Sequence, residues 1–248
     1  MKTSNIILLG LFLVILLSIT TILFAIRKDI KSCNLSVPEK TGKQTEVQLK
    51  LTKFNKLDVE GKFRIHYTQD TLQNVEVKGD SNLIVLAKLS VQDGRLYIKS
   101  IKEFRRNNHV DIYLTNDSLN EIKSSQGAIF NTIAKIKSDQ FKIEGSEGAV
   151  FNISGNFKDL NVNFSTGCVA DLAGSCLNLA LESNTGSVLN ASNLIANNGN
   201  ISSSTGSVLK INVKDELAVQ ASTGSVITYS GNPRIKNWNV SNGAVVNK

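Results

Sequence analysis

Two glutamates, Glu144 and Glu182, are the residues whose type and spacing could do chemistry. Each stands four residues before a glycine of a repeated motif, so stacked repeats would place them two coils apart. At the spacing of neighbouring strands that is roughly 9–10 Å, near the upper end of the separation between the paired carboxylates of inverting glycosidases. A carbohydrate-active enzyme is therefore one hypothesis. The alternative is that acids dot a solvated strand face without any catalytic role.

The other residues of catalytic or metal-binding type form no known motif. His66 and His109 are far apart in the sequence, and no His-x-His pair, Gly-x-Ser-x-Gly elbow or phosphate-binding loop occurs. A calcium-binding solenoid would repeat aspartates at a fixed phase, whereas this chain repeats serine. The sequence therefore predicts a non-enzymatic protein with no metal and no cofactor.

The three cysteines, Cys33, Cys168 and Cys176, contain no Cys-x-x-Cys pair, and at least one of them must be unpaired. Cys168 stands in a column of small residues, and Cys176 in a phase otherwise held by Phe157 and Ala196. We therefore interpret Cys168 and Cys176 as small apolar fillers. A catalytic or bridged role is the alternative.

The composition argues against nucleic-acid binding. The chain has 248 residues and a formal charge of +7, and its basic residues are dispersed, apart from short clusters at Arg27-Lys28 and Arg105-Arg106. Only 6% of the residues are aromatic, which leaves few rings to interleave with a basic face. A solvated, lysine-rich surface explains the charge, and we predict no nucleic-acid partner.

A short motif, typified by the sequence SSTGSVL at 203–209, recurs through the second half of the chain. Its glycine returns after 21, 19, 19, 20, 18 and 19 residues. Glycine at a fixed position of each repeat permits a backbone bend or a positive φ, and we therefore predict structural turns at these residues. The seven glycines are Gly127, Gly148, Gly167, Gly186, Gly206, Gly224 and Gly243.

The positions around the glycine are also constrained. Serine or asparagine stands two residues before it, only alanine, cysteine or serine stands one residue after it, and the residue two after it is always β-branched. We expect the position directly after the glycine, held by Ser207 in one repeat, to admit only a small side chain. We expect the β-branched residue, such as Val208, to enter the core.

Between these columns the sequence alternates apolar and polar residues, as at 160–164 (LNVNF), which indicates strands. Each repeat is too short to bury its own apolar face, so the repeats must stack. We predict an all-β fold, a right-handed parallel β-helix with coils of about 18–21 residues over residues 121–248. Residues 47–120 are predicted to form the first coils and a cap, with a tight antiparallel hairpin at Asp93-Gly94. A β-propeller would need about 40 residues per blade.

The first 28 residues have a different character. Ile6 to Ile26 is a run without charged residues, and as a helix it would span roughly 31 Å, enough to cross a bilayer. The apolar region of a signal peptide is usually only about 7–15 residues long, and Leu23-Phe24-Ala25 is a poor cleavage site. We predict an uncleaved transmembrane anchor at residues 1–28, with a long signal segment as the alternative, and a polar tether at residues 29–46.

Two signals in the sequence disagree about the orientation of this anchor. The positive-inside rule sets Lys2 against Arg27, Lys28 and Lys31, which by itself would leave the domain in the cytoplasm. The character of the domain favours the cell envelope instead. We predict a single-pass protein of a bacterial membrane, attached through residues 6–26, with the β-helix in the periplasm or at the cell surface.

The residue before the repeat glycine offers a surface for binding. Stacked coils would turn these residues into an outward ladder of hydroxyl and methyl groups, which suits contact with a glycan or with ordered water. The alternative is that threonine simply suits an exposed strand edge and its turn. The candidate binding residues are Thr166, Thr185, Thr205 and Thr223.

Several segments occur in an order that is typical of one family. The sequence FNKLDVEGKFRIHYTQD at 54–70 is followed by VEVKGDSNLI at 75–84, DGRLYI at 93–98, the Ser-x-Gly-x-Val coils and VITYSGNP at 226–233. Over roughly residues 54–235 the chain resembles the putative auto-transporter adhesin head GIN domain family. The resemblance implies a right-handed β-helix in the bacterial envelope with no established catalytic activity. Unlike common members, this chain lacks a lipoprotein cysteine.

Three functions remain open at this point. The first is a non-enzymatic, membrane-anchored envelope protein whose rigid β-helix meets a glycan or protein partner at the cell surface. The second is a membrane-tethered scaffold or envelope-stress regulator that acts through self-association. The third is the carbohydrate-active enzyme, for which Glu144→Gln or Glu182→Gln would abolish degradation of a polysaccharide.

Overall fold

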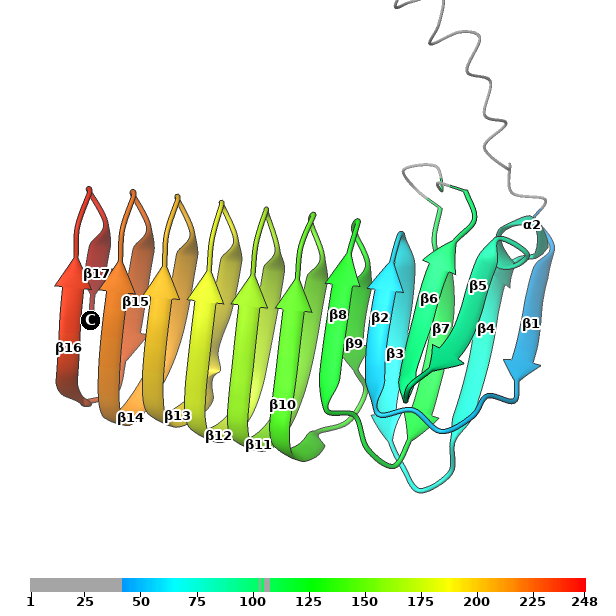
Figure 1. Ribbon diagram of the computed structural model, residues 1–248, viewed down its shortest axis with the longest axis horizontal. Helices are drawn as coiled ribbons and strands as arrows, with labels where there is room; N and C mark the ends of the chain where they lie inside the picture. Colours follow the sequence, from blue (N-terminus) through cyan, green and yellow to red (C-terminus); the bar gives the residue numbers. More distant parts are fainter. Residues whose placement is uncertain (1–41, 103, 105–107) are drawn as a thin grey trace, which may run out of the picture. The chain divides into compact units, whose positions relative to one another are not determined.

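The computed structural model describes residues 42–102, 104 and 108–248 (Figure 1). These residues form a β-solenoid with a single short helix, α2 (Ser81–Ile84), which confirms the all-β prediction. None of the helical structure in the described ranges is long and apolar enough to span a membrane. The predicted anchor at residues 1–28 lies outside the described residues.

Seventeen strands make up the solenoid, and all belong to one hydrogen-bonded sheet. The strands are β1 (Gln44–Leu49), β2 (Lys56–Glu60), β3 (Phe63–Gln69), β4 (Asn74–Asp80), β5 (Ala87–Gln92), β6 (Arg95–Ser100), β7 (Val110–Asn116), β8 (Glu121–Ser125), β9 (Ile129–Thr132), β10 (Ile136–Gly145), β11 (Val150–Phe164), β12 (Val169–Ser183), β13 (Val188–Ser203), β14 (Val208–Ala221), β15 (Val226–Ser230), β16 (Arg234–Val240) and β17 (Val245–Asn247).

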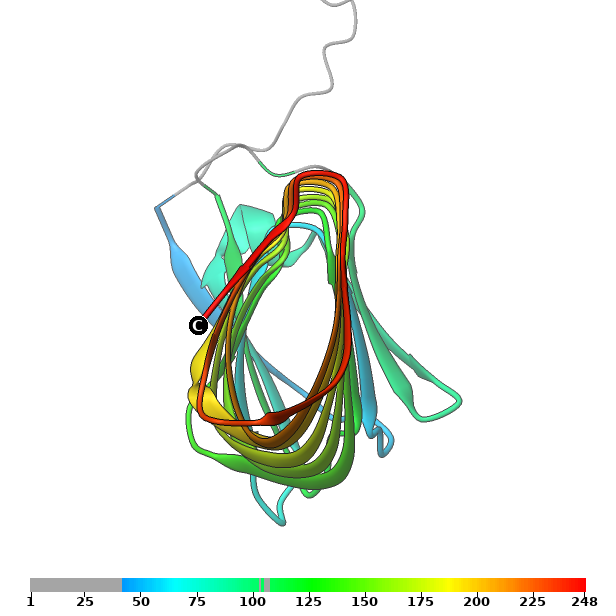
Figure 2. The same ribbon diagram turned by 90° about the vertical axis from the view of Figure 1, so that its left-hand side faces the viewer.

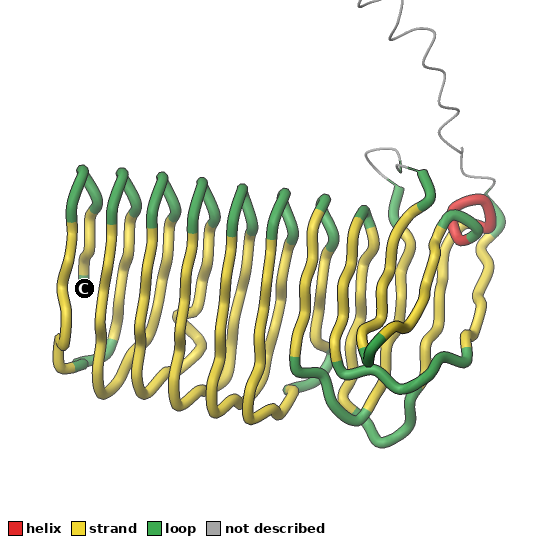
Figure 3. Tube along the Cα trace, in the orientation of Figure 1, coloured by secondary structure: helices red, strands yellow, loops and turns green. Residues whose placement is uncertain are grey.

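Successive repeats stack in parallel and in register. Val150 pairs with Val169, Val169 with Val188, and Val188 with Val208, so equivalent residues of the motif lie on top of one another. The long strands β11 to β14 each run along one wall, bend, and continue along the other wall, as the view along the stack shows (Figure 2). The repeat turns all lie at one edge of the stack (Figure 3).

The order of the strands in space differs from their order in the sequence at the amino-terminal end. The strand β8 stacks on β2 and β9 stacks on β3, while β6 and β7 lie on the opposite side of β2 and β3. The strands β2 and β3 therefore form an inner coil, although they come first in the sequence. The chain then continues through β4 and β5, and β6 and β7 form the coil outside it (Figure 1).

Antiparallel pairs close this end of the solenoid. β1 pairs with β4, β4 pairs with β7, and β5 pairs with β6. The turn between β5 and β6 contains Asp93 and Gly94, both with positive φ, which confirms the predicted hairpin. The helix α2 contributes Leu83, whose side chain is fully buried, and Asp80 caps it by accepting a hydrogen bond from the Asn82 amide.

The core is lined by residues at alternate positions of both walls. The apolar column five residues before the repeat glycine is buried from Ile122 to Val219, whereas Trp238 in the last coil is 43% exposed. On the other wall the buried residues stand three after the glycine, as Phe151, Leu189 and Leu209 do.

The expectation that Val208 enters the core is wrong. Its side chain points outward and is 37% exposed, whereas Ser207 beside it is fully buried. The two walls converge at the turn, so the position that faces inward there admits only a small side chain. Because side chains alternate along a strand, the β-branched residue that follows must face solvent.

Aromatic rings fill the wider part of the core, and glycines make room for them. Phe151 stacks on Phe164 with 5.2 Å between ring centroids. A Cβ on Gly145 would lie only 2.6 Å from the Phe151 ring and 2.9 Å from the Phe164 ring. Gly145 is therefore a packing residue, outside the repeated motif.

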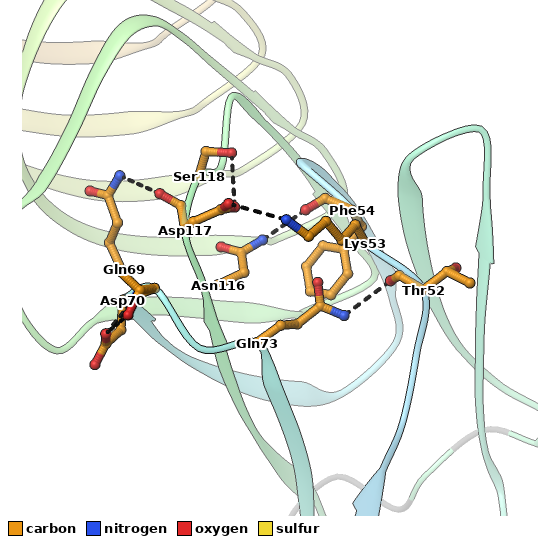
Figure 4. A network of polar contacts seen from close by, with 10 residues as sticks. Thr52, Lys53, Phe54, Gln69, Asp70, Gln73, Asn116, Asp117 and Ser118 are labelled. Carbon is orange, nitrogen blue, oxygen red and sulfur yellow. Dashed lines mark hydrogen bonds and ion pairs between the residues drawn. The ribbon is translucent and has the colours of Figure 1, made fainter.

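A buried polar network joins the segment before β2 to the strands β3 and β7, and Figure 4 shows its contacts around Asn116. The Asn116 amide donates to the Phe54 carbonyl at 2.8 Å, and the Tyr67 hydroxyl donates to the Asn116 side-chain oxygen at 2.7 Å. At the surface, Lys53 approaches Asp117 and the Gln73 amide donates to the Thr52 carbonyl. The two bonds of Asn116 satisfy polar groups that the fold removes from water.

Candidate binding surface

Each repeat turn is a tight two-residue turn with a left-handed backbone. In the turn from Ser204 to Ser207, Thr205 has φ of 51° and Gly206 has φ of 71°, and the Ser207 amide donates to the Ser204 carbonyl at 3.3 Å. Two successive residues with positive φ are the signature of a type I′ turn. All seven repeat glycines have φ between 69° and 77°.

The turns are hydrogen-bonded to one another as well as stacked. The amide of each of the first six repeat glycines donates to the carbonyl of the residue before the glycine in the next coil. Gly148 bonds Thr166 at 3.1 Å, and Gly206 bonds Thr223 at 3.0 Å. This backbone ladder fixes the spacing of the side chains that the turns carry.

The threonine ladder, Thr166, Thr185, Thr205 and Thr223, therefore lies on four successive turns. All four side chains are exposed, and all four residues have φ between 46° and 52°. A β-branched residue in this region is a true outlier and carries a cost of order 1–3 kcal/mol. Of the four ladder hydroxyls, only that of Thr205 has a side-chain partner among the described residues, Ser204 Oγ at 3.4 Å. The ladder thus presents hydroxyl and methyl groups to solvent on a strained but rigid backbone.

A second exposed column runs beside the ladder. We call it the valine column, and it consists of the β-branched residues two after each glycine. Four of its seven members are 37–46% exposed, which is unusual for aliphatic side chains in a regular array. Its members are Ile129, Val150, Val169, Val188, Val208, Val226 and Val245.

The two glutamates considered for catalysis lie on the other wall. Glu144 and Glu182 line a groove of about 400 Å³, with Asn163 between them in register. Glu144 is ion-paired with Lys142 at 2.5 Å, and Glu182 accepts a hydrogen bond from the Asn184 amide at 3.3 Å. Both carboxylates thus make the local polar contacts that are common for surface acids.

The two histidines, distant in the sequence, meet at one carboxylate. Asp111 lies 2.8 Å from His66 Nε2 and 3.5 Å from His109 Nε2, and the Arg64 guanidinium is 3.6 Å away. The His66 ring stacks on Tyr113 with 4.6 Å between centroids. The guanidinium beside the carboxylate opposes a bound cation, and no group of three or more His, Cys, Asp and Glu side chains within the described ranges is arranged to hold a metal ion.

Both described cysteines, Cys168 and Cys176, are free and buried, as the interpretation as core fillers requires. Burial raises the pKa of the Cys168 thiol and raises the pKa of Cys176 to about 12. Reactivity toward alkylating reagents depends on the thiolate.

Alkylation with iodoacetamide at pH 8 is therefore expected to spare both thiols in the folded chain. With a pKa of about 12, Cys176 holds roughly 10³-fold less thiolate at pH 8 than an ordinary cysteine. Peptide mass spectrometry should find Cys168 and Cys176 modified only after unfolding in denaturant. Rapid modification of the folded chain would contradict their placement in the core.

The family described as "Putative auto-transporter adhesin, head GIN domain" matches residues 53–233. The chain belongs to this family. The match covers the amino-terminal rungs of the GIN domain as well as its repeats, and it confirms the resemblance drawn from the sequence. No curated protein matches the chain.

Solved structures share the fold of this GIN domain. A putative adhesin from Bacteroides fragilis is 24% identical, with 84% of this chain and 99% of that chain covered and a TM-score of 0.75. A putative adhesin from Parabacteroides distasonis is 17% identical, with 84% and 98% covered and a TM-score of 0.67. A putative lipid binding protein from the same organism is 16% identical, with 84% and 98% covered and a TM-score of 0.66. At these identities the similarity concerns the fold of the GIN domain.

Two features of this GIN domain were missed in the sequence. The outward valine column was assigned to the core, because two adjacent columns of small and β-branched residues do not show which faces inward. The contact of His66 and His109 with Asp111 depends on the pairing of β3 with β7. The alternation in both strands, with Phe63 and Val110 buried, is the signal that could have found it.

Proposed function

We propose that this chain is a non-enzymatic, membrane-anchored protein of the bacterial envelope, and that its right-handed β-helix presents the threonine ladder to a glycan or protein partner. The family and the similarity of the fold to adhesin-like proteins support this role. The apolar run at residues 6–26 supports attachment to the membrane.

The observation that carries the proposal is the strained backbone of the ladder. A residue such as asparagine would adopt the left-handed conformation at lower cost, and Asn242 does so in the last coil. Four successive turns nevertheless hold threonine, exposed and almost without side-chain partners. Strain of this kind concentrates at functional sites, which supports a role for the ladder in binding.

Replacing all four ladder threonines by valine is expected to weaken binding of the partner at least about 10-fold. Valine keeps the shape and β-branching of threonine and removes only the hydroxyl, so each lost hydrogen bond costs roughly 0.5–1.5 kcal/mol. The measurement is adhesion of the immobilised full chain to a glycan array and to envelope material. Ser202→Val, on the opposite wall, is the control, and equal loss in both variants would refute the ladder as the contact.

Membrane attachment and orientation can be tested separately. An epitope after Lys248 should be degraded when protease is added to intact cells or to cells with a permeabilised outer membrane. Protection of the epitope until the inner membrane is lysed would place the β-helix in the cytoplasm, as the positive-inside rule suggests, and would refute an envelope function.

A further inference from the structure

One wall of the solenoid carries a regular, largely uncharged surface that no part of the described chain covers. The valine column forms its middle, beside the threonine ladder. In the view along the stack this wall runs straight from the turns towards the label C (Figure 2). Across the strands, the flat part of this wall ends where the register shifts between Ala191 and Ile195. Towards the amino terminus, the valine column continues as the charged residues Arg64 and Asp111.

The next outward column on this wall is polar, and its two charged residues are placed symmetrically about the fourth coil. It contains two charged residues, Asp171 in the third coil and Lys210 in the fifth, on either side of Asn190 in the fourth coil. Lys210 has no ion-pair partner among the described residues, and Asp171 accepts only a long hydrogen bond of 3.5 Å from Asn190. The seven members of this column are Asn131, Asn152, Asp171, Asn190, Lys210, Thr228 and Asn247.

From this arrangement we infer that the wall docks against the same wall of a second copy of the chain. A two-fold axis parallel to the strands, passing through the coil of Asn190, places valine column on valine column. The same axis places Asp171 of each copy opposite Lys210 of the other, and Asn190 opposite its own equivalent. The contact is self-complementary, so it closes as a dimer without extending into a fibre.

The size of the wall fits a dimer at the weak end of specific interfaces. Seven coils cover about 29 Å along the stack and five residues of strand about 17 Å across it, so the two copies together bury roughly 1,000 Å². The apolar column stabilises such a contact through the area removed from water. The opposite charges fix its register, because other alignments of the seven coils leave Asp171 and Lys210 unpaired.

The arrangement also sets the position of the threonine ladders. Because the axis is parallel to the strands, the turns of both copies lie at the same edge of the dimer. The two ladders then lie beside one another with opposite directions, which doubles the surface available to a repetitive partner. The dimer does not depend on the proposed adhesive function, and it can form whether or not the ladder binds.

Charge reversal on one wall tests the dimer directly. In the full chain, Asp171→Lys gives two positive charges on the wall and Lys210→Asp gives two negative charges. Each variant alone is expected to self-associate at least tenfold more weakly than the native chain in sedimentation velocity with detergent. A mixture of the two, with one labelled fluorescently, is expected to form the heterodimer with native affinity. The double variant carrying both changes should self-associate like the native chain.

The control is Ala180→Asp, which adds a charge at an exposed position of the opposite wall and should leave self-association unchanged. Single variants that self-associate as strongly as the native chain would overturn the proposal, as would a native chain that stays monomeric. If the single variants instead alter binding to glycans or lipid vesicles while sedimentation is unchanged, the wall serves another partner and the dimer is refuted.

Discussion

Replacing Gly174 by alanine is expected to destabilise the solenoid by about 4 kcal/mol or more, a large fraction of the stability of an ordinary domain. Gly174 has φ of 117°, and a Cβ on it would lie 1.9 Å from the carbonyl oxygen of Gly155 in the preceding coil. Because the obstructing atom belongs to the backbone, relief requires the two coils to separate and their ladder of hydrogen bonds to weaken. Urea denaturation followed by circular dichroism would measure the loss.

The matched control for this prediction is Gly206→Ala. Gly206 also has positive φ, but nothing lies within 4 Å of a Cβ built on it. The cost is therefore limited to the backbone conformation, roughly 1–2 kcal/mol. If both variants lost equal stability, the close approach of Gly174 to Gly155 would have no energetic role.

The glycines that recur in the sequence are not the ones that the fold requires most. The seven repeat glycines are conspicuous because they recur, yet their surroundings are open, and the neighbouring threonines adopt similar φ values with a side chain present. The sterically demanding glycines, Gly145, Gly155, Gly174 and Gly231, stand outside the motif. Gly206→Val is thus predicted to cost less than Gly174→Ala.

The repeats and the hairpin could be predicted because they depend on local signals. A period of 18–21 residues with alternating apolar positions leaves few folds other than stacked coils, and Asp93-Gly94 specifies its turn by itself. The rung order at the amino-terminal end depends on pairings between distant strands, such as Leu57 with both Leu96 and Ile122. Nothing in the sequence of any one of these strands distinguishes the observed spatial order from an order in which the strands stack as they follow one another in the chain.

The candidate surface was only half predictable for a related reason. That threonines at one phase stack follows from the period alone. Their left-handed backbone does not, because threonine is a poor residue for a type I′ turn and asparagine would have been the expected one. The outward direction of Val208 depends on how closely the two walls approach at the turn, where Ser207 already fills the space. That distance is a property of the stacked structure.

Replacing the four ladder threonines by asparagine is expected to stabilise the chain while it removes the proposed contact surface. Asparagine tolerates the left-handed region, whereas a β-branched side chain is strained there. A gain of roughly 0.5–1 kcal/mol per turn gives about 2–4 kcal/mol in total. The urea midpoint should rise with an unchanged m value, and adhesion should fall in the same protein.

The reverse substitution, Asn242→Thr, supplies the control, because Asn242 holds the same turn position with φ of 50° in the last coil. It should lower stability by about the gain that one turn brings. A quadruple variant that became less stable would show that the threonine methyl and hydroxyl groups stabilise the turns, and the strain would then need no functional explanation. Higher stability together with lost adhesion would mean that the chain keeps a costly residue at each turn for what its side chain contacts.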